Sequence, residues 1–239
     1  MYELLSVTGN DARHFLQGQL TQDVRRVDAA YALACAWCNP KGRVVATMTL
    51  VRLADGLGLL VPANMGERLH SKLSMYKLRA DVVLDRVFEW RNSGAIDIDR
   101  LRASGVVIPD DECDAPSAKS ILIRAGIVTI DADNSEKYTP HMLSLDLAGA
   151  VSFDKGCYTG QEIVARTENL GHSRRRLMRY ECDSNVPAVA DELFDGNHAV
   201  GNVVNASGHD VLAVTPTELH GQALTLNGEA ARPASLPWL

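Results

Sequence analysis

The first half of the chain shows a helical hydrophobic pattern followed by several strand-like runs. Apolar residues recur at helical spacing behind Asn10, which can cap a helix, at Ala12, Phe15, Leu16 and Leu20. Strand-like runs then occupy residues 31–38, 44–53 and 57–61, with turn residues between them. A second helical face is marked by Met65, Leu69, Leu73 and Tyr76, and residues 80–84 return to a strand. This order predicts an α+β fold in which helices cover one face of an antiparallel sheet.

After Gly171 the pattern changes to short apolar runs separated by glycines. These runs cover residues 176–182, 192–194, 199–206, 211–214 and 222–226. Their length and spacing predict a small closed β-barrel. Between the two patterns, residues 92–119 are polar and acidic, and the apolar run 121–130 fits a buried helix that leads into a strand, although the pattern alone does not decide this. We therefore divide the chain into a body, residues 1–173, and a C-terminal barrel, residues 174–239.

Composition excludes several classes of protein. The chain has 239 residues, enough for a large core, and its net charge of −6 argues against a general electrostatic grip on nucleic acid. No apolar run approaches the roughly 20 residues that span a bilayer, and the first residues lack the layout of a signal peptide. We expect a cytoplasmic protein with no direct nucleic-acid partner and no membrane contact. The basic run Arg174, Arg175, Arg176 and Arg179 is a candidate contact for phosphates or carboxylates, although a solvated strand edge explains it as well.

Cysteine and histidine spacing gives no metal site. Five cysteines, an odd number without a secretory signal, indicate free thiols in a reducing compartment. Cys35 and Cys38 are spaced as CxxC, but a second such pair is missing, which favours unligated thiols near a strand end. The seven histidines show no HxxxH or HxxE pairing. Only His141, which precedes the motif described next, is a candidate for a site.

The stretch from Asp154 to Glu162, with the sequence DKGCYTGQE, carries the strongest chemical signal. Thr159 and Glu162 have the spacing of a capping box, which predicts a helix that begins at residue 160. Cys157 would then lie two residues before the cap, close to the positive end of the helix dipole. Lys155 adds a second positive charge, and both effects lower the pKa of a thiol. We therefore predict a functional thiol at Cys157, although a buried inert cysteine is the commoner case.

The same stretch carries a family resemblance. KGCYTGQE, followed by Ile163-Val164-Ala165-Arg166, resembles the signature of the YgfZ family, folate-binding relatives of the T-protein (aminomethyltransferase) of the glycine cleavage system. The resemblance extends to residues 7–24, 38–43 and 139–143 and to the terminal residues 236–239. It implies a T-protein-like folate-binding body with a C-terminal small β-barrel. Family members usually carry a longer segment near residues 92–119, so the middle of this chain looks trimmed.

The resemblance also implies a function. YgfZ-like proteins bind tetrahydrofolate and support iron–sulfur enzymes or assembly proteins, and thereby tRNA modification by an iron–sulfur methylthiotransferase. In this account Cys157 and Lys155 are the catalytic residues. The folate contacts would come from an aromatic residue near the N-terminus and from the signature, namely Tyr2, Tyr158, Gln161, Glu162 and Arg166. An intrahelical pair between Glu162 and Arg166 is the structural alternative for those two residues.

Two departures from the family keep other functions open. Aminomethyl transfer by the T-protein resembles a reaction assisted by an acidic residue on the strand after the first glycine hairpin. Residues 43–54, which form the corresponding part of this chain, contain no Asp or Glu. Arg124 stands where relatives commonly place a glutamate for the pterin edge, and an arginine cannot accept a hydrogen bond. The first departure argues against a folate-dependent one-carbon (aminomethyl) transferase, the only enzymatic activity that the resemblance suggests. The second, with the trimmed middle, favours a non-catalytic iron–sulfur scaffold or partner-binding protein.

Overall fold

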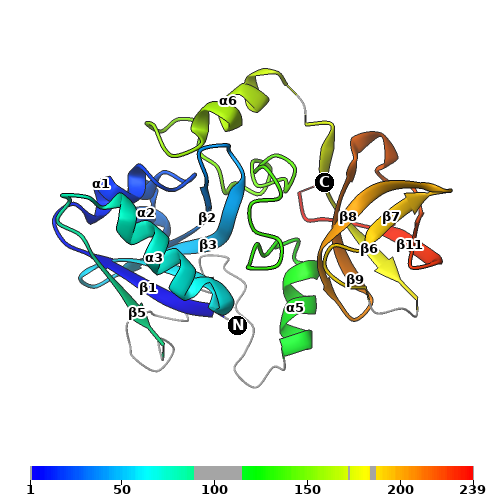
Figure 1. Ribbon diagram of the computed structural model, residues 1–239, viewed down its shortest axis with the longest axis horizontal. Coiled ribbons are helices and arrows are strands. Elements are labelled where there is room, and N and C mark those ends of the chain that lie inside the picture. Colours follow the sequence, from blue (N-terminus) through cyan, green and yellow to red (C-terminus); the bar gives the residue numbers. More distant parts are fainter. Residues whose placement is uncertain (1, 89–114, 172, 184–186, 239) are drawn as a thin grey trace.

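The computed structural model describes residues 2–88, 115–171, 173–183 and 187–238. These residues form an antiparallel sheet and a closed barrel that lie on opposite sides of an irregular segment, drawn in green in Figure 1. The predicted α+β fold with a small C-terminal barrel is therefore confirmed. Within these ranges, no helix has the length and apolar character needed to cross a membrane.

The sheet of the body has five strands in the order β2-β3-β4-β1-β5. Their bounds are β1 (Tyr2–Thr8), β2 (Ala32–Cys38), β3 (Val44–Leu53), β4 (Gly56–Pro62) and β5 (Val83–Val87). The predicted run 80–84 therefore begins too early, and β1 was not predicted. β1 is an inner strand with cover on both faces: Leu5 belongs to the main core under the helices and Leu4 to a cluster on the other face. A strand buried on both faces lacks the alternation that marks a half-exposed strand.

The helices of the body lie on one face of this sheet (Figure 1). They are α1 (Ala12–Gln17), η1 (Val24–Arg26), α2 (Val27–Ala30), η2 (Ala63–Met65) and α3 (Gly66–Tyr76). The predicted cap at Asn10 is wrong, because Asp11 occupies the N-cap position and the Asn10 amide donates to Asp81 Oδ2 at 2.7 Å. Of the predicted apolar face, Met65, Leu69 and Leu73 are buried in the core, whereas Tyr76 at the end of α3 is exposed.

The described part of the body that follows the sheet begins with the helix α5 (Ala115–Arg124). Most of the segment 92–119 that looked trimmed lies outside the described residues. The apolar run 121–130 is helical up to Arg124 as expected, but residues 127–130 are irregular and do not form the expected strand. α5 lies against the barrel, where Arg124 Nε donates to the buried Asp210 carboxylate at 2.7 Å.

The barrel closes in the order β10-β11-β6-β9-β8-β7. Its elements are β6 (Arg175–Cys182), β7 (Glu192–Asp195), β8 (His198–Ser207), β9 (Asp210–Pro216), η3 (Thr217–Leu219), β10 (Leu224–Leu226) and β11 (Glu229–Ala234). The last strand was not predicted, because its sequence EAARPA lacks β-branched and aromatic residues and contains a proline. Pairing with both β10 and β6 holds β11 in place despite this sequence.

Candidate functional site

The helix that follows the signature begins one residue later than the capping box predicts. This helix, α6, covers Gln161–Asn169, and its N-cap is Gly160 with φ of 83° and no side-chain cap. The hydroxyl of Thr159 donates instead to Gln19 Oε1 at 3.4 Å. The predicted capping box is therefore wrong, and Cys157 lies farther from the helix start than expected.

The ammonium of Lys155 is held by the chain between α1 and η1. Nζ donates to the carbonyl oxygens of Gln17, Leu20 and Gln22 at 2.7, 2.6 and 3.0 Å. Burial lowers the pKa of Lys155 to about 8, and the nearby Asp23 carboxylate opposes this shift. The three carbonyls occupy the three N–H donors of the charged form. Lys155 thus fixes the position of the loop, and its donors are directed at carbonyls instead of the Cys157 thiol.

Two glycines let the signature pack on the first hairpin of the body. A Cβ atom on Gly160 would lie 2.4 Å from the carbonyl oxygen of Asn39, and one on Gly42 would lie 2.8 Å from Cβ of Ile163. Both glycines also have positive φ. Gly156 differs from them, since a Cβ there would meet no atom within 4 Å. The hairpin at 39–42 and the signature, which are far apart in sequence, therefore form one close backbone contact.

Tyr158 and Gln161 stabilise the loop of the signature by contacts with other signature residues. Tyr158 is buried, which raises the pKa of its phenol, and its ring centroid lies 5.0 Å from Lys155 Nζ. The side-chain oxygen of Gln161 accepts a hydrogen bond from the Tyr158 amide at 3.2 Å. Tyr158 and Gln161, two of the five residues that the resemblance assigns to folate binding, thus make contacts within the signature itself.

Cys157 is the one exposed thiol among the described cysteines. Cys35 and Cys38 are buried on β2 in two different core clusters, and burial raises the pKa of each thiol to about 12. Cys182 is buried in the barrel, and its pKa is raised for the same reason. Since the thiolate is the reactive form, burial protects these three thiols, whereas Cys157 is accessible to reagents and partners.

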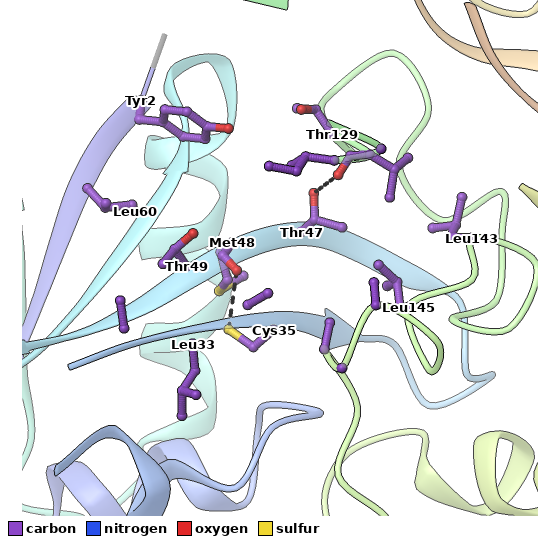
Figure 2. A pocket seen from close by; sticks show the side chains of 18 of the residues that line it. Tyr2, Leu33, Cys35, Thr47, Met48, Thr49, Leu60, Thr129, Leu143 and Leu145 are labelled. Carbon is purple, nitrogen blue, oxygen red and sulfur yellow. Dashed lines mark hydrogen bonds between the residues drawn. The ribbon is translucent and has the colours of Figure 1, made fainter. Parts of the chain in front are cut away.

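A cavity of about 370 Å³ lies between the sheet and the irregular segment (Figure 2). Its wall is mostly apolar, and the polar side chains in it are mainly hydroxyls, from Tyr2, Thr47, Thr49 and Thr129. No charged side chain of the described residues lines it. Figure 2 shows the Tyr2 hydroxyl directed toward the Thr129 side of the cavity. Burial raises the pKa of Tyr2, and a hydrogen bond with Thr129 opposes this shift.

Sequence reasoning did not place Gly126 and Trp238 in this cavity. The Trp238 ring packs on Gly126, where a Cβ atom would lie 2.3 Å from the ring and where φ is 71°. The chain end after the barrel therefore returns to the body and closes one side of the cavity. The only signal was the apolar ending LPWL, which has no periodicity that places it.

The signature residues do not line this cavity. Of the predicted site residues, Tyr2 alone is in its wall, whereas Cys157, Lys155, Tyr158 and Gln161 are not. Two further candidates, Glu162 and Arg166, are exposed on α6, and their side chains form no ion pair with each other within 4.0 Å. The structural alternative, an intrahelical ion pair between Glu162 and Arg166, is therefore wrong.

One segment, residues 20–22, nevertheless contacts both the cavity wall and the loop of the signature. The Gln22 amide donates to the Gly149 carbonyl at 2.7 Å, and the Thr21 hydroxyl donates to the Ala150 carbonyl at 2.8 Å. Gly149 and Ala150 line the cavity, while the Gln22 carbonyl accepts from Lys155 on the other side. Residues 20–22 thus connect the cavity wall to the loop that carries Cys157.

The basic run of β6 is mostly engaged within the protein. Arg176 forms an ion pair with Asp146 at 2.7 Å, and Arg179 forms one with Asp210 at 2.8 Å. Both arginines are largely buried, with side-chain exposures of 17% and 12%. Arg176 and Arg179 are therefore structural. Neither of the two earlier interpretations, a contact for phosphates or carboxylates and a solvated strand edge, applies to them.

Comparisons with known proteins agree with this architecture. Residues 174–239 match the family model described as CAF17, C-terminal beta-barrel domain. A solved aminomethyltransferase T of the glycine cleavage system from Bartonella henselae has a TM-score of 0.73 and 15% identity, covering 100% of this chain and 84% of that chain. At this identity the likeness concerns the fold.

Two curated relatives extend the similarity beyond the barrel. Both are described as tRNA-modifying protein YgfZ, from Yersinia pestis strains Pestoides F and Angola (biovar Antiqua). Each is 25% identical to this chain in an alignment that covers 80% of this chain and 72% of the relative. Together with the match of the barrel, these similarities extend the likeness to proteins described as YgfZ over most of this chain.

Proposed function

We propose that this chain is a folate-binding protein that supports iron–sulfur enzymes, and indirectly tRNA modification, through the thiol of Cys157. The observation that carries the proposal is the contrast within the signature. Lys155, Tyr158 and Gly160 are fixed by carbonyls, burial and a close backbone contact, whereas the Cys157 side chain is exposed. Such a loop presents one sulfur to a partner at a defined position.

A thiol in this position has two chemical uses. As a thiolate it is a nucleophile, and as a soft ligand it binds iron–sulfur clusters. Either use requires access from outside the protein, and of the described thiols only Cys157 has it. The proposal needs no catalytic role for Lys155, which instead holds the loop.

The central cavity is the proposed folate site. Its volume of about 370 Å³ falls within the range of about 300–1,000 Å³ that is common for small-molecule pockets. The pterin ring would stack on Tyr2, with the hydroxyl of Thr49 facing its polar edge, because the hydroxyl of Thr47 is already bonded to the backbone of Val128 and Ile130. Arg124 does not line the cavity, because its guanidinium pairs with Asp210 of the barrel. The arginine therefore gives no reason to exclude folate.

The lining of the cavity also bears on whether this chain could catalyse one-carbon transfer. General acid–base assistance to one-carbon transfer needs a titratable side chain within reach of the reacting atoms. The described lining contains no carboxylate, histidine or lysine, and the thiol of Cys35 has its pKa raised to about 12. These observations support a binding role for the cavity over aminomethyl transfer.

Complementation tests the role of Cys157. In cells that lack their own YgfZ-type protein, we expect this chain to restore the methylthio modification of tRNA, measured by mass spectrometry of tRNA nucleosides. Cys157→Ala should fail at equal protein level, because no other side chain there supplies sulfur. Cys182→Ala, which removes a buried thiol, should restore the modification. Full restoration by Cys157→Ala would refute a thiol mechanism and leave the scaffold alternative.

Titration of the purified chain with tetrahydrofolate tests the cavity separately. We expect saturable binding that Tyr2→Ala weakens several-fold and Tyr2→Phe weakens less, because phenylalanine keeps the ring. Cys157→Ala should bind folate like the unmodified chain, since Cys157 does not line the cavity. Absence of binding would rule out the folate part of the proposal without affecting the complementation result.

A further inference from the structure

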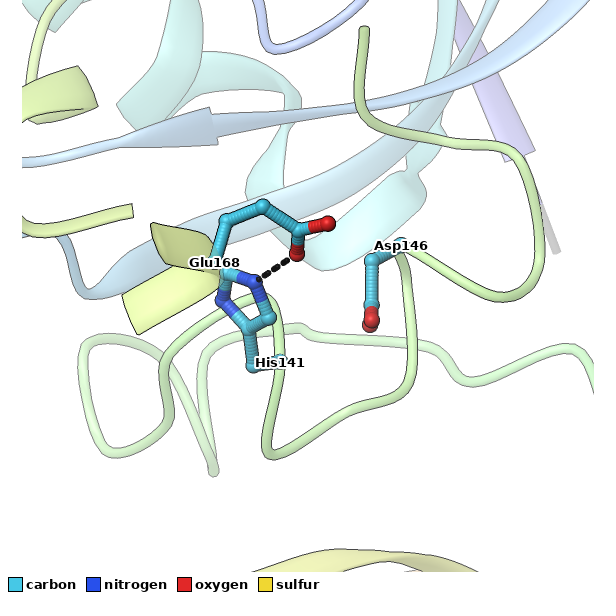
Figure 3. Close-up of side chains that lie close together, drawn as sticks. All are labelled: His141, Asp146 and Glu168. Carbon is cyan, nitrogen blue, oxygen red and sulfur yellow. Dashed lines mark hydrogen bonds and ion pairs between the residues drawn. The ribbon is translucent and has the colours of Figure 1, made fainter. Parts of the chain in front are cut away.

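Three metal-ligating side chains converge beside the last turn of α6, namely His141, Asp146 and Glu168 (Figure 3). One ligand atom of each residue lies within 4.8 Å of the other two. Nε2 of His141 is 3.0 Å from Oε2 of Glu168. The three positions are 5 and 22 residues apart and match no metal-binding motif, so the sequence marked His141 as a candidate but not its two partners. None of the three lines the central cavity.

Two of the three side chains, those of His141 and Asp146, are buried. His141 is 1% exposed, and its Nδ1 has no hydrogen-bond partner among the described residues. The Asp146 side chain is 8% exposed; its Oδ1 accepts from Arg176 at 2.7 Å. No described group donates to Oδ2 of Asp146, and Figure 3 shows that carboxylate beside the His141 ring. With Nε2 already 3.0 Å from Glu168, Nδ1 lies on the other side of the imidazole ring, so the case for an ion rests on the convergence of one imidazole and two carboxylates beside a buried histidine.

The electrostatics of the cluster favour a cation. Two carboxylates face one guanidinium, that of Arg176, so the cluster has an excess of negative charge when His141 is neutral. The C-terminal end of α6 adds partial negative charge, because Glu168 belongs to its last turn. The Glu168 side chain is 45% exposed, which gives an ion a route from solvent.

We propose that His141, Asp146 and Glu168 bind a divalent transition-metal ion, with zinc as the best match. One imidazole and two carboxylates suit zinc, and three protein ligands leave a fourth position for water. With zinc–ligand bonds of about 2.0 Å, tetrahedral ligand atoms lie roughly 3.3 Å apart. His141 Nε2 and Glu168 Oε2, which are 3.0 Å apart, already have nearly this spacing, and the ligand atom of Asp146, which lies within 4.8 Å of both, has to move closer. Arg176 would orient Asp146 as an outer-shell hydrogen bond does.

Cobalt titration tests this site in the whole chain after removal of metals with a chelator. We expect one Co²⁺ per chain, visible by its d–d absorption and displaced by Zn²⁺. Glu168→Gln and Asp146→Asn should each weaken binding at least 10-fold, since removing a ligand costs no less than removing its hydrogen-bond partner. Glu162→Gln, the same change in the first turn of α6, should bind like the unmodified chain.

Cysteine thiols are the competing ligands for cobalt, and a cysteine variant distinguishes them from the proposed site. Binding should persist in Cys157→Ser without a sulfur-to-cobalt charge-transfer band. His141 is buried and its replacement can unfold the chain, so the partly exposed Glu168 is the deciding position, with circular dichroism to verify the fold. The proposal is overturned if Glu168→Gln binds like the unmodified chain, if Cys157→Ser abolishes binding, or if no Co²⁺ binds at millimolar concentration.

Discussion

The ammonium of Lys155 donates a hydrogen bond of 2.6 Å to the carbonyl oxygen of Leu20, across 135 positions of the sequence. This contact joins the signature to the segment that leaves α1. It explains why a lysine precedes the cysteine: an ammonium has the three donors that three converging carbonyls require.

Lys155→Met should destabilise the protein by about 2–3 kcal/mol, because a charged hydrogen-bond donor is lost and its acceptors stay partly buried. Urea denaturation measures this change. Lys41→Met, at an exposed hairpin lysine, should change the free energy of unfolding by less than about 0.5 kcal/mol. Equal stability of both variants would mean that the carbonyl contacts contribute nothing.

Gly160→Ala should be far more harmful than Gly156→Ala. Gly160 has φ of 83° and no room for a Cβ beside Asn39, so we expect a loss on the order of 2–4 kcal/mol. Gly156 is exposed and its Cβ would meet nothing, so alanine there should cost less than about 1 kcal/mol. Thermal unfolding of the two variants compares them directly, and similar melting temperatures would contradict the close contact of signature and hairpin.

Cys157 should react with iodoacetamide fastest of the described cysteines in the folded protein at neutral pH. It is exposed, whereas Cys35 and Cys38 are buried with pKa values raised to about 12. Mass spectrometry of peptides after brief labelling identifies the modified residue. A Cys113→Ser background removes the cysteine that lies outside the described residues. Faster labelling of Cys35 or Cys38 would show that β2 is open in solution.

Acid should remove the stabilisation that Asp23 provides. Hydrogen bonds from Arg25 lower the pKa of Asp23 from 3.8 to about 2. Because the folded-state pKa is depressed, the stabilisation is present above pH 3.8 and disappears as the pH falls toward 2. Arg25 is 72% exposed and solvent screens the pair, so we expect about 1 kcal/mol.

Asp23→Asn should therefore be less stable than the unmodified chain at pH 6 and equally stable near pH 2. Urea denaturation at the two pH values measures the difference. Asp55→Asn, at an exposed turn, is the control for loss of one carboxylate. A constant difference between Asp23→Asn and the unmodified chain at both pH values would exclude the ion pair as its cause.

The sequence by itself determined the elements whose pattern is local. β3 was predicted at its observed bounds, because residues 44–53 form an apolar run enriched in β-branched residues between two turns. The barrel followed from short runs between glycines. The exposed, chemically distinctive Cys157 was identified from its neighbours, since a glycine-flanked thiol before a helix is a local feature.

Tertiary structure alone decided what depends on distant partners. Lys155 was expected to serve the thiol, yet its donors reach Gln17, Leu20 and Gln22, which no spacing rule brings to it. Trp238 closes a cavity against Gly126, and His141 meets Glu168. The physical reason is the same in each case: periodicity shows which face of an element is buried, whereas the identity of the group opposite depends on how the elements pack.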